Sequence, residues 1–109
     1  MNLTRTLKMK LKEFEDLAKK YNCLVIPRQD WDGWSYGFYA PKLADYRLAT
    51  YYNQFQAAEM YTTIDKKQFT KIEDLEYELK IKFKLLKQKR IEKKIDELEK
   101  DFENVTRNT

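Results

Sequence analysis

The last third of the chain, from Thr70 to Val105, contains no glycine and no proline. It opens with Thr70 and Glu73, whose side chains can each accept a hydrogen bond from the other residue's free backbone N–H at a helix N-terminus. Leu, Glu and Lys dominate the run and are good helix formers. The run therefore predicts one long helix from about residue 70 to residue 105.

Residues 75–85 also fit a different structure. Apolar and polar residues alternate strictly there, in the order Leu-Glu-Tyr-Glu-Leu-Lys-Ile-Lys-Phe-Lys-Leu. Such alternation is typical of a half-buried strand. Because no turn residue separates this piece from the helically spaced apolar residues that follow it, we favour the helix and keep the strand as the alternative.

As a helix, the run carries two apolar stripes on different sides. The first consists of Ile72, Leu75, Leu79, Phe83 and Leu86. The second consists of Tyr77, Ile81, Leu85, Ile91, Ile95, Leu98, Phe102 and Val105. A helix of about 35 residues is about 52 Å long, whereas a compact domain of this size has a radius of gyration of about 13 Å. We therefore expect part of the second stripe to overhang the body, where the N-terminal helix, a second copy of the chain or another protein could cover it.

The rest of the chain predicts an α+β domain of order αβββαα, with a three-stranded antiparallel sheet. The predicted elements are an N-terminal helix over 2–21, strands over 22–28, 34–39 and 46–52, a short helix over 54–65 and the long helix. Residues 1–105 would form this single domain, and residues 106–109 a flexible tail.

Local patterns support these elements. In the N-terminal helix, apolar residues recur at spacings of three and four; they are Leu3, Leu7, Leu11, Phe14, Leu17, Ala18 and Tyr21. Asp30 and Gly33 are typical of a tight turn between the first two strands. The short helix is predicted from a capping pattern at Asn53 and Gln56, followed by helical spacing of Ala57, Met60, Tyr61 and Ile64.

The composition argues against common catalytic chemistry. The chain has no histidine, which removes the usual general base near neutral pH and the commonest metal ligand. We find no phosphate-binding loop and no metal-ligand spacing, and we predict no catalytic residue, cofactor or metal. One short pattern, Glu78-Leu79-Lys80, matches a fragment of metal-dependent nucleases. A metal-dependent nuclease is therefore a third possible function, and it would require residues 75–85 to be a strand.

The chain has a single cysteine, Cys23, within an apolar run. This context favours a buried thiol in a reducing compartment. No apolar stretch is long enough for a signal peptide or a membrane span, so we expect a cytoplasmic protein with no membrane contact.

Positive charge is concentrated within residues 80–94, between two acidic segments. Lys80, Lys84, Lys87, Arg90 and Lys94 are the candidate nucleic-acid-binding residues of this cluster. Such cations could neutralise phosphates with a salt-dependent affinity. The alternative is a solvated helix surface.

Our leading hypothesis is a small non-catalytic binding protein that acts as an inhibitor or adaptor by contacting a protein partner. The candidate contact residues are Trp31, Ile91, Ile95, Leu98 and Phe102. Trp31 lies in a polar turn that does not require its burial, and the other four belong to the second stripe. A homodimer through the C-terminal helix and nucleic-acid binding through residues 80–94 are the alternatives. A composition rich in Lys, Tyr, Asn and Ile is also typical of small phage or mobile-element proteins.

Overall fold

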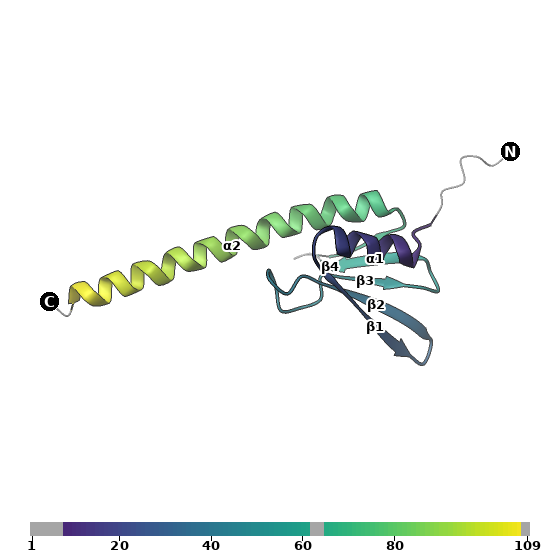
Figure 1. The fold of residues 1–109 in the computed structure, drawn as a ribbon, viewed down its shortest axis with the longest axis horizontal. Coiled ribbons are helices and arrows are strands. Elements are labelled where there is room, and N and C mark those ends of the chain that lie inside the picture. Colours follow the sequence, from purple (N-terminus) through teal and green to yellow (C-terminus); the bar gives the residue numbers. More distant parts are fainter. Residues whose placement is uncertain (1–7, 62–64, 108–109) are drawn as a thin grey trace.

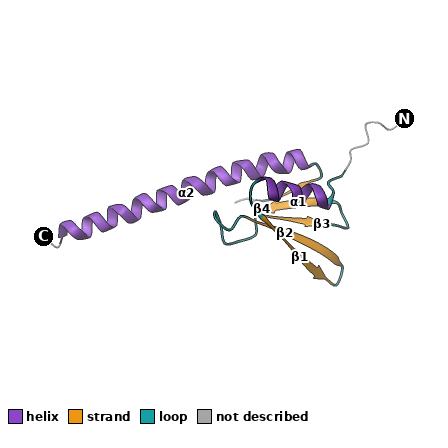
Figure 2. Cartoon of the chain, viewed as in Figure 1, coloured by secondary structure: helices purple, strands orange, loops and turns teal. Residues whose placement is uncertain are grey.

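The computed structural model describes residues 8–61 and 65–107, with side chains described as far as residue 101. Over these residues the chain forms two helices and five strands (Figures 1 and 2). They are α1 (Leu11–Lys20), β1 (Leu24–Asp30), β2 (Gly33–Tyr39), β3 (Ala49–Tyr52), β4 (Ala57–Tyr61), β5 (Lys66–Phe69) and α2 (Ile72–Arg107). The class is α+β, as predicted.

The strands form one antiparallel sheet in which each strand pairs with the next along the chain, in the order β1-β2-β3-β4-β5. The hairpin between β1 and β2 turns through Trp31 and Asp32, and Asp30 pairs with Gly33. Gly33 has a φ of 133°, which glycine adopts far more readily than other residues. Both helices lie on the same side of the sheet (Figure 2).

The core lies between this face of the sheet and the two helices. Phe14 of α1 packs edge-on against Phe38 of β2, with ring centroids 5.7 Å apart, and against Tyr51 of β3 at 5.5 Å. Phe83 of α2 stacks on Phe38 at 6.3 Å. Phe38 therefore joins both helices to the sheet.

The prediction of a short helix over residues 54–65 is wrong. Residues 53–56 form a turn, and Ala57–Tyr61 is strand β4, paired with β3 on one side and β5 on the other. Gln56, predicted to complete a helix cap, has a left-handed φ of 50°. The hydrogen bonds of two neighbouring strands outweigh the helical spacing of Ala57, Met60 and Tyr61. Ile64 lies outside the described residues.

The prediction of a three-stranded sheet is also wrong, since β4 and β5 give five strands. β5 reads Lys-Lys-Gln-Phe, and only Phe69 is buried. A lysine-rich edge strand carries little apolar signal, and its charges discourage pairing with other chains. The order αβββαα is therefore corrected to αβββββα.

Within the described residues, the N-terminal helix starts later than predicted: the sequence predicts a helix over 2–21, and α1 spans Leu11–Lys20. Residues 8–10 are not helical, and α1 begins at Leu11. The carboxylate of Glu13 accepts a hydrogen bond from the Lys10 N–H at 3.0 Å, which caps the helix start. The earlier part of the predicted helix, with Leu3 and Leu7, lies outside the described residues.

The long C-terminal helix is confirmed, and the strand alternative for residues 75–85 is wrong. Residues two apart on a helix differ by about 200° around the axis, so alternating apolar residues form two stripes on opposite sides. Leu75 and Leu79 are fully buried, whereas Tyr77 is exposed. The helix also continues through Thr106 and Arg107, the first two residues of the predicted tail.

Candidate protein-interaction surface

The first four turns of helix α2 pack against the body of the molecule, which consists of α1 and the sheet. Leu75, Leu79, Phe83 and Leu86 are buried against α1 and the sheet, and Ile72 is partly buried. After Leu86, every residue with a described side chain is exposed. The longest dimension of the molecule is 77 Å and its radius of gyration is 18.8 Å. The predicted overhang is therefore present, and Figure 1 shows α2 extending well past the sheet.

A set of polar contacts fixes the orientation of α2. Glu76 Oε2 accepts hydrogen bonds from Tyr21 Oη at 2.6 Å and from Lys20 Nζ at 2.7 Å. On the other side of the helix, Glu78 Oε1 accepts from Lys67 Nζ at 3.1 Å. The bonds from Lys20 and Tyr21 hold the pKa of the Glu76 carboxyl below its ordinary value. These contacts determine which face of α2 meets the body and which face is free.

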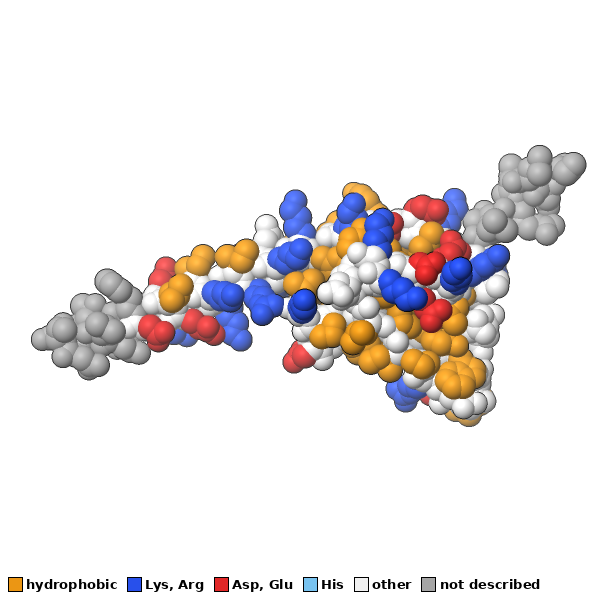
Figure 3. All heavy atoms as spheres, in the orientation of Figure 1, with side chains coloured by type: hydrophobic (Ala, Val, Ile, Leu, Met, Phe, Trp, Pro, Cys, Tyr) orange, Lys and Arg blue, Asp and Glu red, His pale blue; other side chains and the backbone are white. Residues whose placement is uncertain are grey.

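The free face carries an apolar surface that we call the outer stripe. It consists of Tyr77, Ile81, Leu85, Ile91, Ile95 and Leu98, all of which are exposed. The stripe faces away from the body because the buried residues lie about 160–240° around the helix from Tyr77. Figure 3 shows hydrophobic side chains on the overhang, with Lys and Arg nearer the sheet and Asp and Glu nearer the C-terminal end.

Three of the four predicted contact residues on α2 lie next to one another on the outer stripe. Ile91, Ile95 and Leu98 are 58%, 48% and 68% exposed. Phe102 continues the same spacing within α2, but its side chain lies beyond the described ones. Helix α1 does not cover this surface: Phe14 and Leu17 are directed into the core instead. Helix α1 therefore leaves the described part of the outer stripe uncovered.

Trp31 is 97% exposed at the turn between β1 and β2. In Figure 1 this turn lies at the opposite end of the molecule from the C-terminal overhang of α2. The structure therefore does not bring Trp31 and the outer stripe into one site.

The five predicted nucleic-acid contacts spread over about 120° of the surface of α2. Arg90 lies on the side toward the body, where its guanidinium donates a hydrogen bond to the carbonyl of Lys42. Lys80, Lys84, Lys87 and Lys94 are exposed farther around the helix. Within the described residues, a partly different set of cations lines one hollow. Lys89, Arg90 and Lys93 of α2 join Lys42 of the loop after β2 around a hollow of about 390 Å³, which Asp45 also lines. Sequence reasoning missed Lys42, because only the tertiary fold brings its loop beside α2.

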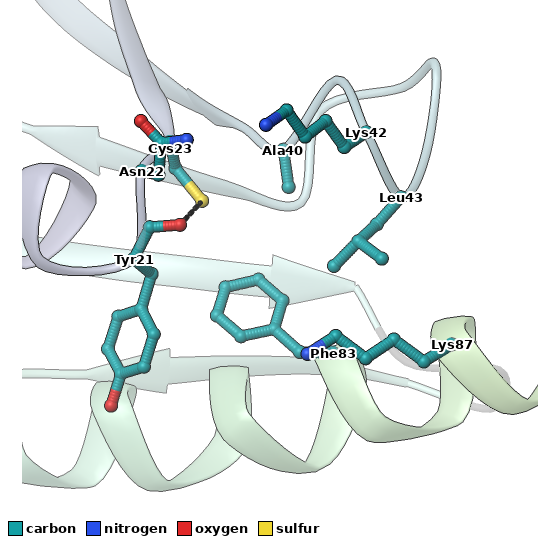
Figure 4. A pocket seen from close by; sticks show the side chains of 8 residues that line it. All are labelled: Tyr21, Asn22, Cys23, Ala40, Lys42, Leu43, Phe83 and Lys87. Atoms are coloured by element: carbon teal, nitrogen blue, oxygen red, sulfur yellow. Dashed lines mark hydrogen bonds between the residues drawn. The ribbon is translucent and has the colours of Figure 1, made fainter.

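A smaller pocket of about 180 Å³ lies between the end of α1, the loop after β2 and α2 (Figure 4). Its lining residues are Tyr21, Asn22, Cys23, Ala40, Lys42, Leu43, Phe83 and Lys87. The Cys23 thiol donates a hydrogen bond of 3.4 Å to the Tyr21 carbonyl, and burial raises its pKa above the ordinary value. The pocket is smaller than the roughly 300–1,000 Å³ of usual small-molecule sites.

The nuclease-like pattern Glu78-Leu79-Lys80 lies on α2. Residues two apart on a helix point to nearly opposite sides, and Glu78 is paired with Lys67. The strand that this function required is absent from the segment. Among the described residues, no group of three or more His, Cys, Asp or Glu side chains is placed to hold a metal ion.

Comparisons with protein-family models, curated proteins and solved structures return no match to this chain. Neither described helix is both long and apolar enough to cross a membrane.

Proposed function

We propose that this chain is a non-catalytic binding protein that acts as an inhibitor or adaptor, with the outer stripe of α2 as its contact surface. One observation carries the proposal: α2 has an apolar face on each side, and the fold buries only one of them. Each apolar side chain transferred from water into an interface contributes roughly 1.5–3 kcal/mol when it is fully buried. An overhanging helix that keeps such residues exposed is suited to contact a second protein surface.

The spacing of the stripe indicates how the contact is made. Ile91, Ile95 and Leu98 follow one another at intervals of four and three residues. This is the spacing with which a helix places its apolar anchors into the groove of a partner or against another helix. Trp31, at the other end of the molecule, would make a separate contact, because an exposed aromatic ring at a turn is a frequent interface anchor.

The proposal is tested by placing charge on the stripe. Ile91→Glu, Ile95→Glu and Leu98→Glu are expected to abolish binding to other copies or other proteins, measured by affinity capture and light scattering. They should leave the thermal unfolding temperature nearly unchanged, because these side chains are exposed and contribute little to the core. The matched control is Lys100→Glu, on the opposite side of the same overhang. If all three stripe variants retain every interaction of the wild type, the stripe is not the contact surface.

Nucleic-acid binding is the second candidate function, and the meeting of Lys42 with Lys89, Arg90 and Lys93 favours it. Phosphate contacts by these cations would make the affinity fall steeply with salt. Lys89→Glu with Lys93→Glu should weaken binding to DNA and RNA at low salt, whereas Ile95→Glu should not. Failure of the wild type to bind either nucleic acid at low salt would eliminate this candidate.

A further inference from the structure

Five of the six outer-stripe residues follow a seven-residue repeat, and the sixth, Leu85, lies beside it. With Ile91 and Leu98 at position d of the heptad abcdefg, the a positions are Ile81, Gln88, Ile95 and Phe102. The d positions are Tyr77, Lys84, Ile91, Leu98 and Val105. An a/d repeat of apolar residues is the pattern with which one helix packs along another as a coiled coil. Among parallel coiled coils, Ile at a with Leu at d, as at Ile95 and Leu98, favours two strands over three or four.

The fold leaves room for a second helix along the a and d positions, which we call the seam. Leu75, Leu79 and Leu86 face the body, and the a/d positions lie on the other side of α2. Two copies joined along the seam would therefore carry their sheets on the outside of the pair, away from each other. The helix extends past the body, so the overhang from Ile91 onward is open to a partner helix (Figure 1).

The charges beside the seam determine the orientation. Along the overhang the g positions are occupied by Lys80, Lys87, Lys94 and Asp101, and Glu92 and Glu99 occupy e positions. In a parallel pair, g of one helix faces e of the next heptad in the other helix. Lys87 would then face Glu92, and Lys94 would face Glu99, in both directions across the pair. In an antiparallel pair, g faces g and e faces e, so Glu92 and Glu99 would face acidic side chains, and Asp101 would be the one acidic partner for the Lys residues at g.

We propose that a second copy of this chain covers the outer stripe, with the two α2 helices parallel and in register. This inference rests on the proposed function, since it names the partner of the same surface. Gln88 at an a position would meet its own equivalent across the seam, where two amides can hydrogen-bond, and a polar residue at a single a position fixes register. Lys84 at d lies near the N-terminal end of the seam, where its long side chain can carry the ammonium group out to water.

The charge argument is tested with the full chain by analytical ultracentrifugation. The wild type is expected to sediment as a dimer. Lys87→Glu with Lys94→Glu places like charges across the seam and should raise the dimer dissociation constant by about tenfold or more. Glu92→Lys with Glu99→Lys should have the same effect. An equimolar mixture of the two double variants should recover the affinity of the wild type, because every g–e pair is again opposite in sign. Failure of the mixture to recover dimerisation would overturn the charge pairing.

The orientation is tested by disulfide trapping in a Cys23→Ser background. Gln88→Cys places a thiol opposite its own equivalent only in the parallel, in-register pair, so mild oxidation should give a cross-linked dimer. Lys100→Cys, at an outward f position of the same helix, is the control and should not cross-link at the same protein concentration. Equal cross-linking at both positions, or none at Gln88→Cys in a sample that sediments as a dimer, overturns the parallel arrangement.

A wild type that remains monomeric at about 100 μM overturns the inference of a second copy. If the monomeric wild type captures a different protein and the Ile95→Glu variant does not, the proposed function stands without this inference. If Ile95→Glu changes no interaction of a monomeric wild type, both fail. Thermal unfolding of each variant shows that the fold is retained, since the substituted side chains are exposed in the single chain.

Discussion

The phenol of Tyr21, one residue after α1 ends, donates a 2.6 Å hydrogen bond to the carboxylate of Glu76 in the second turn of α2. The ammonium group of Lys20 reaches the same carboxylate oxygen at 2.7 Å. Tyr21 also packs on Phe83, with ring centroids 5.4 Å apart. This one polar cluster therefore joins the two helices and sets the rotation of α2, which decides that Tyr77 and Ile81 face outward.

Glu76 should make the stability of the protein depend on pH. Its folded-state pKa lies below the ordinary 4.5, mainly because of the hydrogen bond from Lys20 and then that from Tyr21. A lowered pKa stabilises the fold fully above the unfolded pKa, and this contribution is lost as pH falls through the folded value. Glu76→Gln should therefore unfold at a lower denaturant concentration than the wild type at pH 7, and the difference should shrink below about pH 4.5. Glu97→Gln on the overhang is the control; a difference that persists unchanged at pH 2.5 would contradict the assignment.

Tyr51 ties the segment before α1 to the sheet. Its side chain is 1% exposed, and its hydroxyl donates a 2.7 Å hydrogen bond to the Met9 carbonyl. Tyr51→Phe leaves that buried carbonyl without this donor, so we expect a loss of about 1–3 kcal/mol in the free energy of unfolding. Tyr61→Phe, at an exposed position of β4, should cost less than about 0.5 kcal/mol. Chemical denaturation of both variants measures the difference. Equal losses in the free energy of unfolding would show that the buried hydrogen bond does not stabilise the fold more than an exposed hydroxyl group does.

The two apolar faces of α2 should respond differently to truncation. Leu79 is fully buried, so Leu79→Ala should lower the free energy of unfolding by about 2–5 kcal/mol, from lost burial and a residual cavity. Leu85 is half exposed on the outer stripe, so Leu85→Ala should change it by less than about 1 kcal/mol at protein concentrations low enough to keep the chain monomeric. Denaturant titrations compare them directly. Similar losses from the two variants would mean that the outer stripe is covered within the single chain.

The sequence predicts the elements whose local signals agree with the fold. The unbroken run of helix formers identifies α2, although the helix begins at Ile72 and not at the cap predicted for Thr70. The alternation from Leu75 to Leu85, which resembles a strand, arises because this helix is apolar on two opposite sides. The hairpin at Asp30 and Gly33 is predicted from its turn residues, and the register of β1 and β2 follows from it.

The remaining elements depend on contacts between distant segments. Ala57 and Ala58 favour a helix locally, but β3 and β5 supply strand partners on both sides of β4, and Ala58 pairs with Tyr51 and with Phe69. Only one of the four residues of β5 is apolar, so its sequence shows no periodic spacing of apolar residues that would predict a strand. On the candidate surface, Ile91, Ile95 and Leu98 could be chosen from spacing alone. Their exposure could not, because it depends on α1 packing into the core instead of along the stripe.

Cys23 offers a test of the pocket beside α2. Burial raises the pKa of its thiol above the ordinary 9.0, and the thiol also donates to the Tyr21 carbonyl. Only the thiolate reacts readily with alkylating reagents, so the folded protein should react with iodoacetamide at pH 7 more slowly than the same chain in guanidinium chloride. The rate should rise as pH increases beyond 9, provided the fold is retained. Mass spectrometry of timed samples measures both rates, and Cys23→Ser confirms the site. Equally fast alkylation of the folded and unfolded chains at pH 7 would show that the pocket neither shields the thiol nor holds it in its protonated form.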